Sequence, residues 1–232
     1  MEKTKGRIIM KRTKLAARTL PHYTRGEEIM NMVTHIAGGG LSIPAVVACL
    51  IRAATHNDLW GLITGSIYGL TLLAVFTMSA VYHGLRPGTA KKVLQILDHC
   101  CIYFLIAGTY THIVLCAIRP IYPAIGWGLM VWEWGLCITA ATLTAIDLKA
   151  YKVFSMTCYI GMGWSIVFFL PQTLAALTPA GFGFLLAGGI AYTVGAVLFG
   201  LGKKIPWMHA VFHLFVILGA ALQWITVMFY VI

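Results

Sequence analysis

The sequence predicts an all-α integral membrane protein, built as a bundle of seven transmembrane helices. Of its 232 residues, 59% are hydrophobic and only 10% are charged, with a mean hydropathy of +0.84. This composition lies outside the range of water-soluble domains. The apolar residues gather in stretches of about 20 residues, the length that crosses a hydrocarbon core. Lysine and arginine gather in alternate connections between these stretches, which is typical of a chain that crosses a membrane repeatedly.

The seven predicted spans follow one another with short connections. Their limits are 32–52, 61–84, 93–117, 122–145, 153–171, 181–201 and 206–231. Because the connections leave no room for a second domain, we expect residues 27–232 to form one transmembrane domain. Residues 1–26 form a basic tail without an evident signal peptide, and we expect this tail to lie in the cytosol against anionic lipid.

The distribution of positive charge predicts the orientation of the chain. Fifteen Lys and Arg residues fall on one side of the predicted bundle, against Arg52 and Arg119 on the other. The positive-inside rule then gives a cytoplasmic N-terminus and an external C-terminus. We interpret the net charge of +10 as this topology signal and expect no nucleic-acid partner. The six cysteines lie in or beside apolar segments without a CxxC pair, which indicates small buried hydrophobic residues.

Two histidines stand at the start of the last apolar segment. Lys203 and Lys204 mark the membrane boundary, and Pro206 is expected to begin the helix. His209 and His213 follow, four residues apart and therefore on one helix face about one turn apart. Ionisable groups at membrane depth cost about 2.5–3.5 kcal/mol each, so the pair calls for partners. On its own, HxxxH also fits ordinary buried or surface histidines.

Three further polar residues are predicted to share the depth of this pair. His83 ends the second span, Ser79 precedes it by one turn, and Asp98 lies one to two turns into the third span. Three imidazoles with an open position are the ligand set of a catalytic zinc, which lowers the pKa of its bound water towards about 7. Asp98 would orient that water and take its proton, and Ser79 would hold the Asp98 carboxylate.

Each member of this layer has a structural alternative. His83 fits an interfacial histidine at a helix end, and Asp98 fits a carboxylate paired near Lys91 and Lys92. Ser79 fits a helix serine bonded to its own backbone. Agreement in depth is what favours the joint site.

These residues carry a resemblance to a known family. The chain has, in order, Glu28-x-x-Asn31-x-x-x-His35, Ser79-x-x-x-His83, Asp98 and His209-x-x-x-His213. This combination resembles the haemolysin III group of the progestin and adipoQ receptor superfamily, which includes the adiponectin receptors. The resemblance covers nearly the whole chain, from Glu27 to Ile232.

The resemblance implies a seven-helix bundle with a cytoplasmic N-terminus and zinc held by His83, His209 and His213. It implies that Asp98 meets the zinc-bound water. For related members of the superfamily it also implies hydrolysis of lipid amides such as ceramide. The bacterial branch takes its name from red-cell lysis.

Two other sets of polar residues are left open. Glu28, Asn31 and His35 share one stripe of the first helix and fit a second shell of ligands or a proton path. Glu27 completes a capping box with Thr24, and acids suit a helix start in any case. Glu133 lies near the middle of the fourth span without an evident cation, so it is protonated, faces a cavity or carries protons.

The sequence therefore favours an intramembrane zinc hydrolase, with membrane lipids as partners and a lipid or fatty-acyl amide or ester as substrate. The first alternative is a non-enzymatic sensor of membrane state, in which zinc braces the helices. A cytolytic or pore-forming protein and a proton or ion transporter are further alternatives. We expect the protein in the bacterial inner (plasma) membrane.

Overall fold

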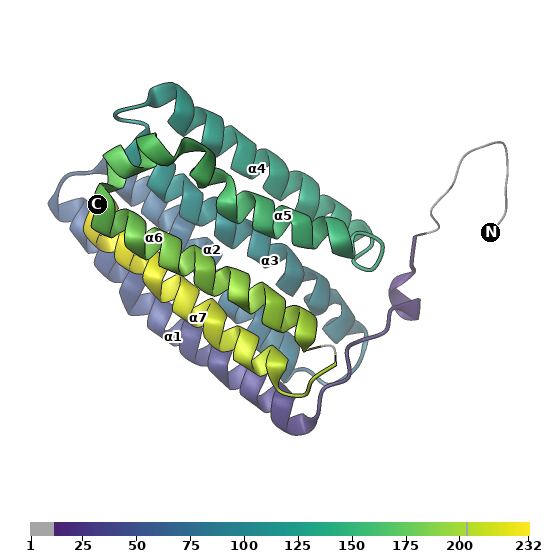
Figure 1. Ribbon diagram of the computed structural model, residues 1–232. Helices are drawn as coiled ribbons and strands as arrows, with labels where there is room; N and C mark the ends of the chain where they lie inside the picture. The colour runs from purple at the N-terminus through teal and green to yellow at the C-terminus, as the bar shows by residue number, and fades with distance from the viewer. Residues whose placement is uncertain (1–11, 203) are drawn as a thin grey trace, which may run out of the picture.

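The computed structural model describes residues 12–202 and 204–232, and within these ranges the chain is helical without a strand. Figure 1 shows the helices packed side by side along a common direction. Six helical stretches are long and apolar enough to cross a membrane. The expected all-α membrane architecture is confirmed at this level. Lys203 and the first 11 residues of the predicted tail lie outside the described residues.

Helix α1 (Arg25–Thr55) begins at the predicted capping box. The Thr24 Oγ1 accepts a hydrogen bond from the Glu27 backbone N at 3.2 Å, and the Glu27 Oε2 accepts one from the Thr24 backbone N at 2.9 Å. The helix starts seven residues before the predicted span because its first turns are polar and lie outside the apolar window. These turns carry Glu28 and Asn31 into the bundle.

The next three helices follow the predicted spans closely. They are α2 (Leu59–Gly84), α3 (Thr89–Ile113) and α4 (Pro123–Ile146). Helix α3 continues into a π-helical turn, Val114–Ile118. All six cysteines are free, and four of them are buried, namely Cys49, Cys100, Cys137 and Cys158. This agrees with their interpretation as small hydrophobic residues.

The fifth and sixth predicted spans fall in one helical stretch of 50 residues, Lys152–Leu201. It comprises α5 (Lys152–Trp164), a 3-10 turn (Ser165–Phe169) and α6 (Leu170–Leu201). Thr178 interrupts α6 with φ 58° and ψ 159°, and its Oγ1 accepts a hydrogen bond from the Gly181 backbone N at 3.3 Å. Thr178 therefore caps a helix that restarts at Pro179. This single non-helical residue replaces the loop expected between the spans that end at 171 and begin at 181. Figure 1 shows the last part of α6 running beside α7.

Helix α7 (Met208–Thr226) begins two residues later than predicted and ends in a π-helical turn, Val227–Val231. Pro206 lies in the preceding turn. Trp207 has φ 65°, and its backbone N donates a hydrogen bond to the Glu27 Oε1 at 2.7 Å. This bond holds the start of α7 against the start of α1.

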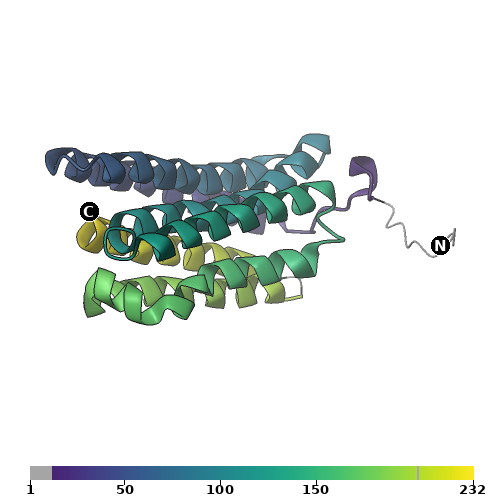
Figure 2. The same cartoon turned by 90° about the horizontal axis from the view of Figure 1, so that it is seen from above.

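The described part of the basic tail packs against the end of α4. The Thr13 backbone N donates to the Asp147 Oδ2 at 2.7 Å, and the guanidinium groups of Arg12 and Arg18 donate to the Ile146 carbonyl. Figures 1 and 2 show the tail at one end of the bundle and the C-terminus at the other. Burial opposes ionisation of Asp147, but backbone N–H groups of Thr13, Ala150 and Lys149 outweigh it and lower its pKa to about 2.

We expect Asp147→Asn to release the tail. The ionised carboxylate is the form that accepts these bonds, so docking is complete at neutral pH and is lost as the pH falls from the ordinary value of 3.8 towards 2. Limited trypsin digestion at neutral pH should cleave after Arg12, Lys14 or Arg18 several-fold faster in the variant. Asp58→Asn is the matched control, and equal cleavage in both variants would contradict the docking.

Candidate metal centre

Three histidines from two helices meet at one end of the bundle. His83 lies in the last turn of α2, and His209 and His213 lie in the first two turns of α7. All three are buried, and one ring nitrogen of each lies within 4.8 Å of the others. The ring of His83 lies 5.2 Å from that of His209 and 5.1 Å from that of His213. The group could hold a metal ion.

The spacing of the ring nitrogens fits tetrahedral zinc. The Nε2 atoms of His83 and His209 are 3.4 Å apart. Zn–N bonds of about 2.0–2.1 Å in tetrahedral geometry place two ligand nitrogens about 3.3 Å apart. The pair therefore already has the separation of two ligands on one ion.

The other ring nitrogens of two histidines are held by α1. The His83 Nδ1 lies 2.7 Å from the Glu28 Oε2, and the His213 Nδ1 lies 3.2 Å from the Asn31 carbonyl oxygen. Because both partners are acceptors, these nitrogens carry the proton and each Nε2 keeps its lone pair. A carboxylate or carbonyl behind a ligating histidine is the usual arrangement at protein metal sites.

Lys91 on α3 completes this arrangement. Its Nζ is 2.6 Å from the Glu28 Oε1 and 3.0 Å from the Leu85 carbonyl oxygen, and the residue is 3% exposed. Lys91 thus pairs with Glu28, whereas the sequence offered it as a neighbour of Asp98. Its role was missed because a lysine beside a predicted span is first interpreted as a boundary charge.

Two aromatic side chains stack on histidine rings of the cluster. The His35 ring stacks on His213 at 3.7 Å with an interplanar angle of 16°, and Tyr23 stacks on His209 at 4.9 Å. Burial raises the pKa of Tyr23, and the nearby carboxylates of Glu28, Asp98 and Glu27 add to this effect. The phenol therefore keeps its proton at neutral pH. Every member of the Glu28, Asn31 and His35 stripe thus contacts a histidine of the cluster.

The other two predicted site residues, Asp98 on α3 and Ser79 on α2, make no hydrogen bond to the histidine cluster within the described part of the chain. Asp98 has a side chain that is 16% exposed, with its Oδ2 3.6 Å from the His99 Nδ1. Ser79 is buried on α2, one turn before His83. Across the described residues, no hydrogen bond connects either of them with the other or with the three histidines. Their catalytic roles stay predictions.

Comparison with known proteins identifies the family. A family profile described as haemolysin-III related matches residues 23–224. The chain belongs to the haemolysin III family. The resemblance noted in the motifs is thereby confirmed.

Two bacterial relatives and a human one show how widely this chain type occurs. Hemolysin-3 of Bacillus cereus is 38% identical over 206 residues, covering 89% of this chain and 92% of the relative. The Hemolysin-3 homolog of Bacillus subtilis (strain 168) is 36% identical over 208 residues, covering 90% and 96%. The monocyte to macrophage differentiation factor of Homo sapiens is 31% identical over 206 residues, covering 85% and 82%.

We expect His83→Ala and His209→Ala to abolish stoichiometric binding of a divalent metal ion. Glu28→Gln should keep the three ligands but weaken the affinity about 10- to 100-fold, because the His83 Nδ1 loses its charged acceptor. Elemental analysis of purified protein and chelator competition measure both effects. His56→Ala, in an exposed position after α1, is the control, and unchanged metal content in His209→Ala would contradict the site.

Proposed function

We propose that this haemolysin III protein is an intramembrane zinc hydrolase that cleaves an amide or ester bond of a lipid acyl group. The observation that carries the proposal is the buried cluster of His83, His209 and His213, with its ring nitrogens at ligand spacing. Three neutral imidazoles with an open fourth position are typical of catalytic zinc, whereas structural zinc has four protein ligands. A bound zinc ion would supply an activated water at neutral pH and polarise the scissile carbonyl.

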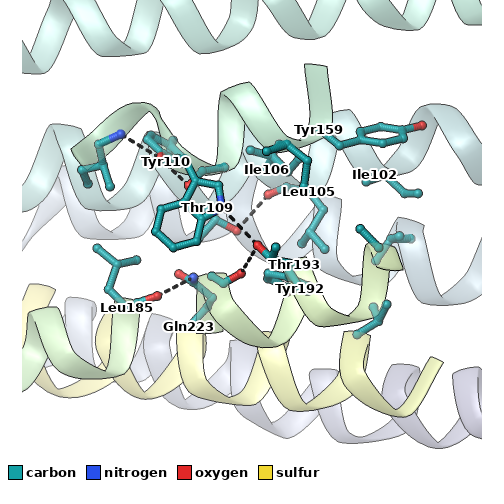
Figure 3. Close-up of a pocket in the computed structure, with 18 of the residues that line it drawn as sticks. Ile102, Leu105, Ile106, Thr109, Tyr110, Tyr159, Leu185, Tyr192, Thr193 and Gln223 are labelled. Carbon is teal, nitrogen blue, oxygen red and sulfur yellow. Dashed lines mark hydrogen bonds between the residues drawn. The ribbon is translucent and has the colours of Figure 1, made fainter. Parts of the chain in front are cut away.

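An apolar cavity beside the cluster supports a lipid substrate. It has a volume of about 160 Å³ and lies between α3, α5, α6 and α7. Figure 3 shows Tyr192, Thr193 and Gln223 around it. Its lining includes His99 and Phe199, and the Phe199 ring lies 5.6 Å from that of His209. Gln223, which also lines the cavity, follows His213 by ten residues or about 15 Å along a helix, so the cavity extends away from the histidines along the bundle.

Different residues of the chain would orient the ligands, accept the proton of the water and donate a hydrogen bond near the acyl carbonyl. Glu28 and the Asn31 carbonyl hold the rings of His83 and His213 in the ligating tautomer. Asp98, on α3 and partly exposed, would orient the attacking water and accept its proton, with Ser79 as its positioning residue. The protonated phenol of Tyr23, stacked on His209, is available as a hydrogen-bond donor.

The proposal includes seven membrane crossings. A straight helix of 50 residues would be about 75 Å long, more than twice the hydrocarbon core of about 30 Å. We therefore propose that Lys152–Leu201 crosses twice, with its turn at Thr178 and Pro179. The tail and the C-terminus at opposite ends of the bundle support an odd number of crossings. Together with the distribution of positive charge, this favours a cytoplasmic N-terminus. We propose that the protein lies in the inner (plasma) membrane.

A sensor with a structural metal is the second candidate. It is favoured by the bracing of α1, α2 and α3 through Glu28 and Lys91. Among the described residues, Asp98 also makes no hydrogen bond to the three histidines of the cluster and lies beside His99 instead. A cytolytic role is suggested by the name of the Bacillus cereus relative alone. Measurement of turnover separates these candidates.

We expect Asp98→Asn to keep the metal ion but to reduce fatty-acid release from acyl-amide lipids such as ceramide by about 10²- to 10⁴-fold, the range of a general base. Mass spectrometry of lipids incubated with purified protein in vesicles measures the release. Asp58→Asn, on the connection before α2, should leave it unchanged. Equal turnover in wild type and Asp98→Asn would remove Asp98 from the mechanism, and a metal-loaded wild type without turnover would favour the sensor.

We expect Gly189→Phe to block the cavity. Gly189 lines the cavity and its missing Cβ faces open space, so the ring would take the volume of the acyl chain. Release of long-chain fatty acids should fall at least tenfold while metal content stays at the wild-type value. Gly183→Phe is the matched control, because Gly183 on the same helix also faces open space and lies outside the cavity lining.

A further inference from the structure

We propose that Glu133 forms a second functional site, a proton-binding site between α3, α4 and the 3-10 turn that follows α5. Glu133 lies near the middle of α4 and is 0% exposed. The histidines of the metal centre lie on α2 and α7 with partners on α1, and α3 contributes Lys91 to that centre and Tyr110 to the surroundings of Glu133, so the two sites share no residue. The hydrolase mechanism does not use Glu133.

The carboxyl group of Glu133 is incompletely partnered. The Ser165 Oγ donates a hydrogen bond to its Oε1 at 2.7 Å. The buried Oε2 has no hydrogen-bond partner among the described residues. Ser165 is the first residue of the 3-10 turn, so the carboxyl group lies at the point where the α-helical pattern of α5 ends.

The backbone groups at the end of α5 have hydrogen-bond partners other than Glu133. The Tyr110 hydroxyl donates to the Gly163 carbonyl oxygen at 3.0 Å and accepts from the Ile166 backbone N at 3.1 Å. These two bonds occupy the backbone groups on either side of Ser165. The orphan Oε2 is therefore not a partner for free backbone groups, and it remains available for a ligand.

A proton is the ligand that this environment favours. The titratable groups that face Glu133 are the phenol of Tyr110 on α3 and the thiol of Cys137 on α4, and α5 contributes the neutral hydroxyl of Ser165. No cationic side chain of the described residues faces it. An ionised carboxylate with one neutral donor would bear an uncompensated desolvation cost of several kcal/mol. A carboxylic acid avoids this cost.

A metal cation fits this site poorly. Hard cations take six or more oxygen ligands. Here the carboxyl group and the Ser165 hydroxyl are the available oxygens, because the Tyr110 hydroxyl is already engaged on both sides. Proton binding is thus coupled to the packing of α4 on α5, since loss of the proton would leave a charge between the two helices.

An apolar carbodiimide tests the site in the purified full-length protein. Dicyclohexylcarbodiimide reacts with a protonated acid: the carboxyl proton moves to a carbodiimide nitrogen, and a carboxyl oxygen adds to the central carbon. An acyl shift to nitrogen then gives a stable N-acylurea, with no leaving group. We expect peptide mass spectrometry to find Glu133 labelled at neutral pH. Labelling should fall as the pH is raised through the alkaline range and should be unaffected by added NaCl at constant pH.

Two outcomes of this experiment overturn the proposal. Absence of label on Glu133 at neutral and mildly acidic pH would mean that the carboxyl group is ionised. Protection by Na⁺ at constant pH would mean that the site binds a metal cation. A water-soluble carbodiimide, which labels the exposed acids, should leave Glu133 unlabelled, because the carboxyl group is 0% exposed and is reached only through apolar surroundings.

Variants provide an independent readout. Glu133→Gln should abolish the label at this position and keep the thermal unfolding midpoint within a few degrees of wild type, because the amide is a neutral isostere. A large loss of stability in this variant would contradict a neutral carboxyl group. Ser165→Ala should extend labelling to higher pH, because the ionised form loses its donor. Ser66→Ala, whose hydroxyl bonds its own helix backbone, should leave the pH profile unchanged.

Discussion

The histidine cluster depends on the two hydrogen bonds that the Glu28 carboxylate accepts. One of its oxygens accepts from the His83 ring and the other from the Lys91 ammonium group. This bridge joins α1, α2 and α3, and it sets the proton of His83 on Nδ1. The Nε2 of His83 then faces His209 at ligand distance. A carboxylate with two charged or polarised donors is stable at a depth where a lone one would be costly.

Buried polar groups in this bundle are mostly hydrogen-bonded, and Glu133 is among the described residues that keep a buried polar atom without a partner. In a hydrocarbon environment a polar group needs a partner within the protein. His83 and His213 have Glu28 and the Asn31 carbonyl behind them, and Glu27 joins the starts of α1 and α7. Glu133 keeps one oxygen without a partner. Glu28 differs from Glu133 in this respect, because both oxygens of the Glu28 carboxylate have partners.

Much of the architecture could be predicted from local information. The apolar windows located the helices, and the Thr24 and Glu27 pair marked the start of α1. The spacing of His209 and His213 placed both rings on one face. The windows left residues 172–180 as a connection, and the structure has there a single non-helical residue, Thr178, followed by Pro179. They also misplaced the start of α7, because the Trp207 conformation depends on a bond from a helix 180 residues away.

By itself the sequence determined the membrane class, the histidines and their common depth, because hydropathy and helical periodicity are properties of neighbouring residues. Only the tertiary structure decided that Glu28 and Lys91 stand behind His83, and that Asp98 lies beside His99 without a bond to the cluster. It also decided that Ser165 is the partner of Glu133. In each case several helices offer side chains at the same depth in the bundle. Depth alone does not say which neighbouring helix a side chain faces, that is, its azimuth about the helix axis. Azimuth is set by how the helices pack, which involves all of them at once.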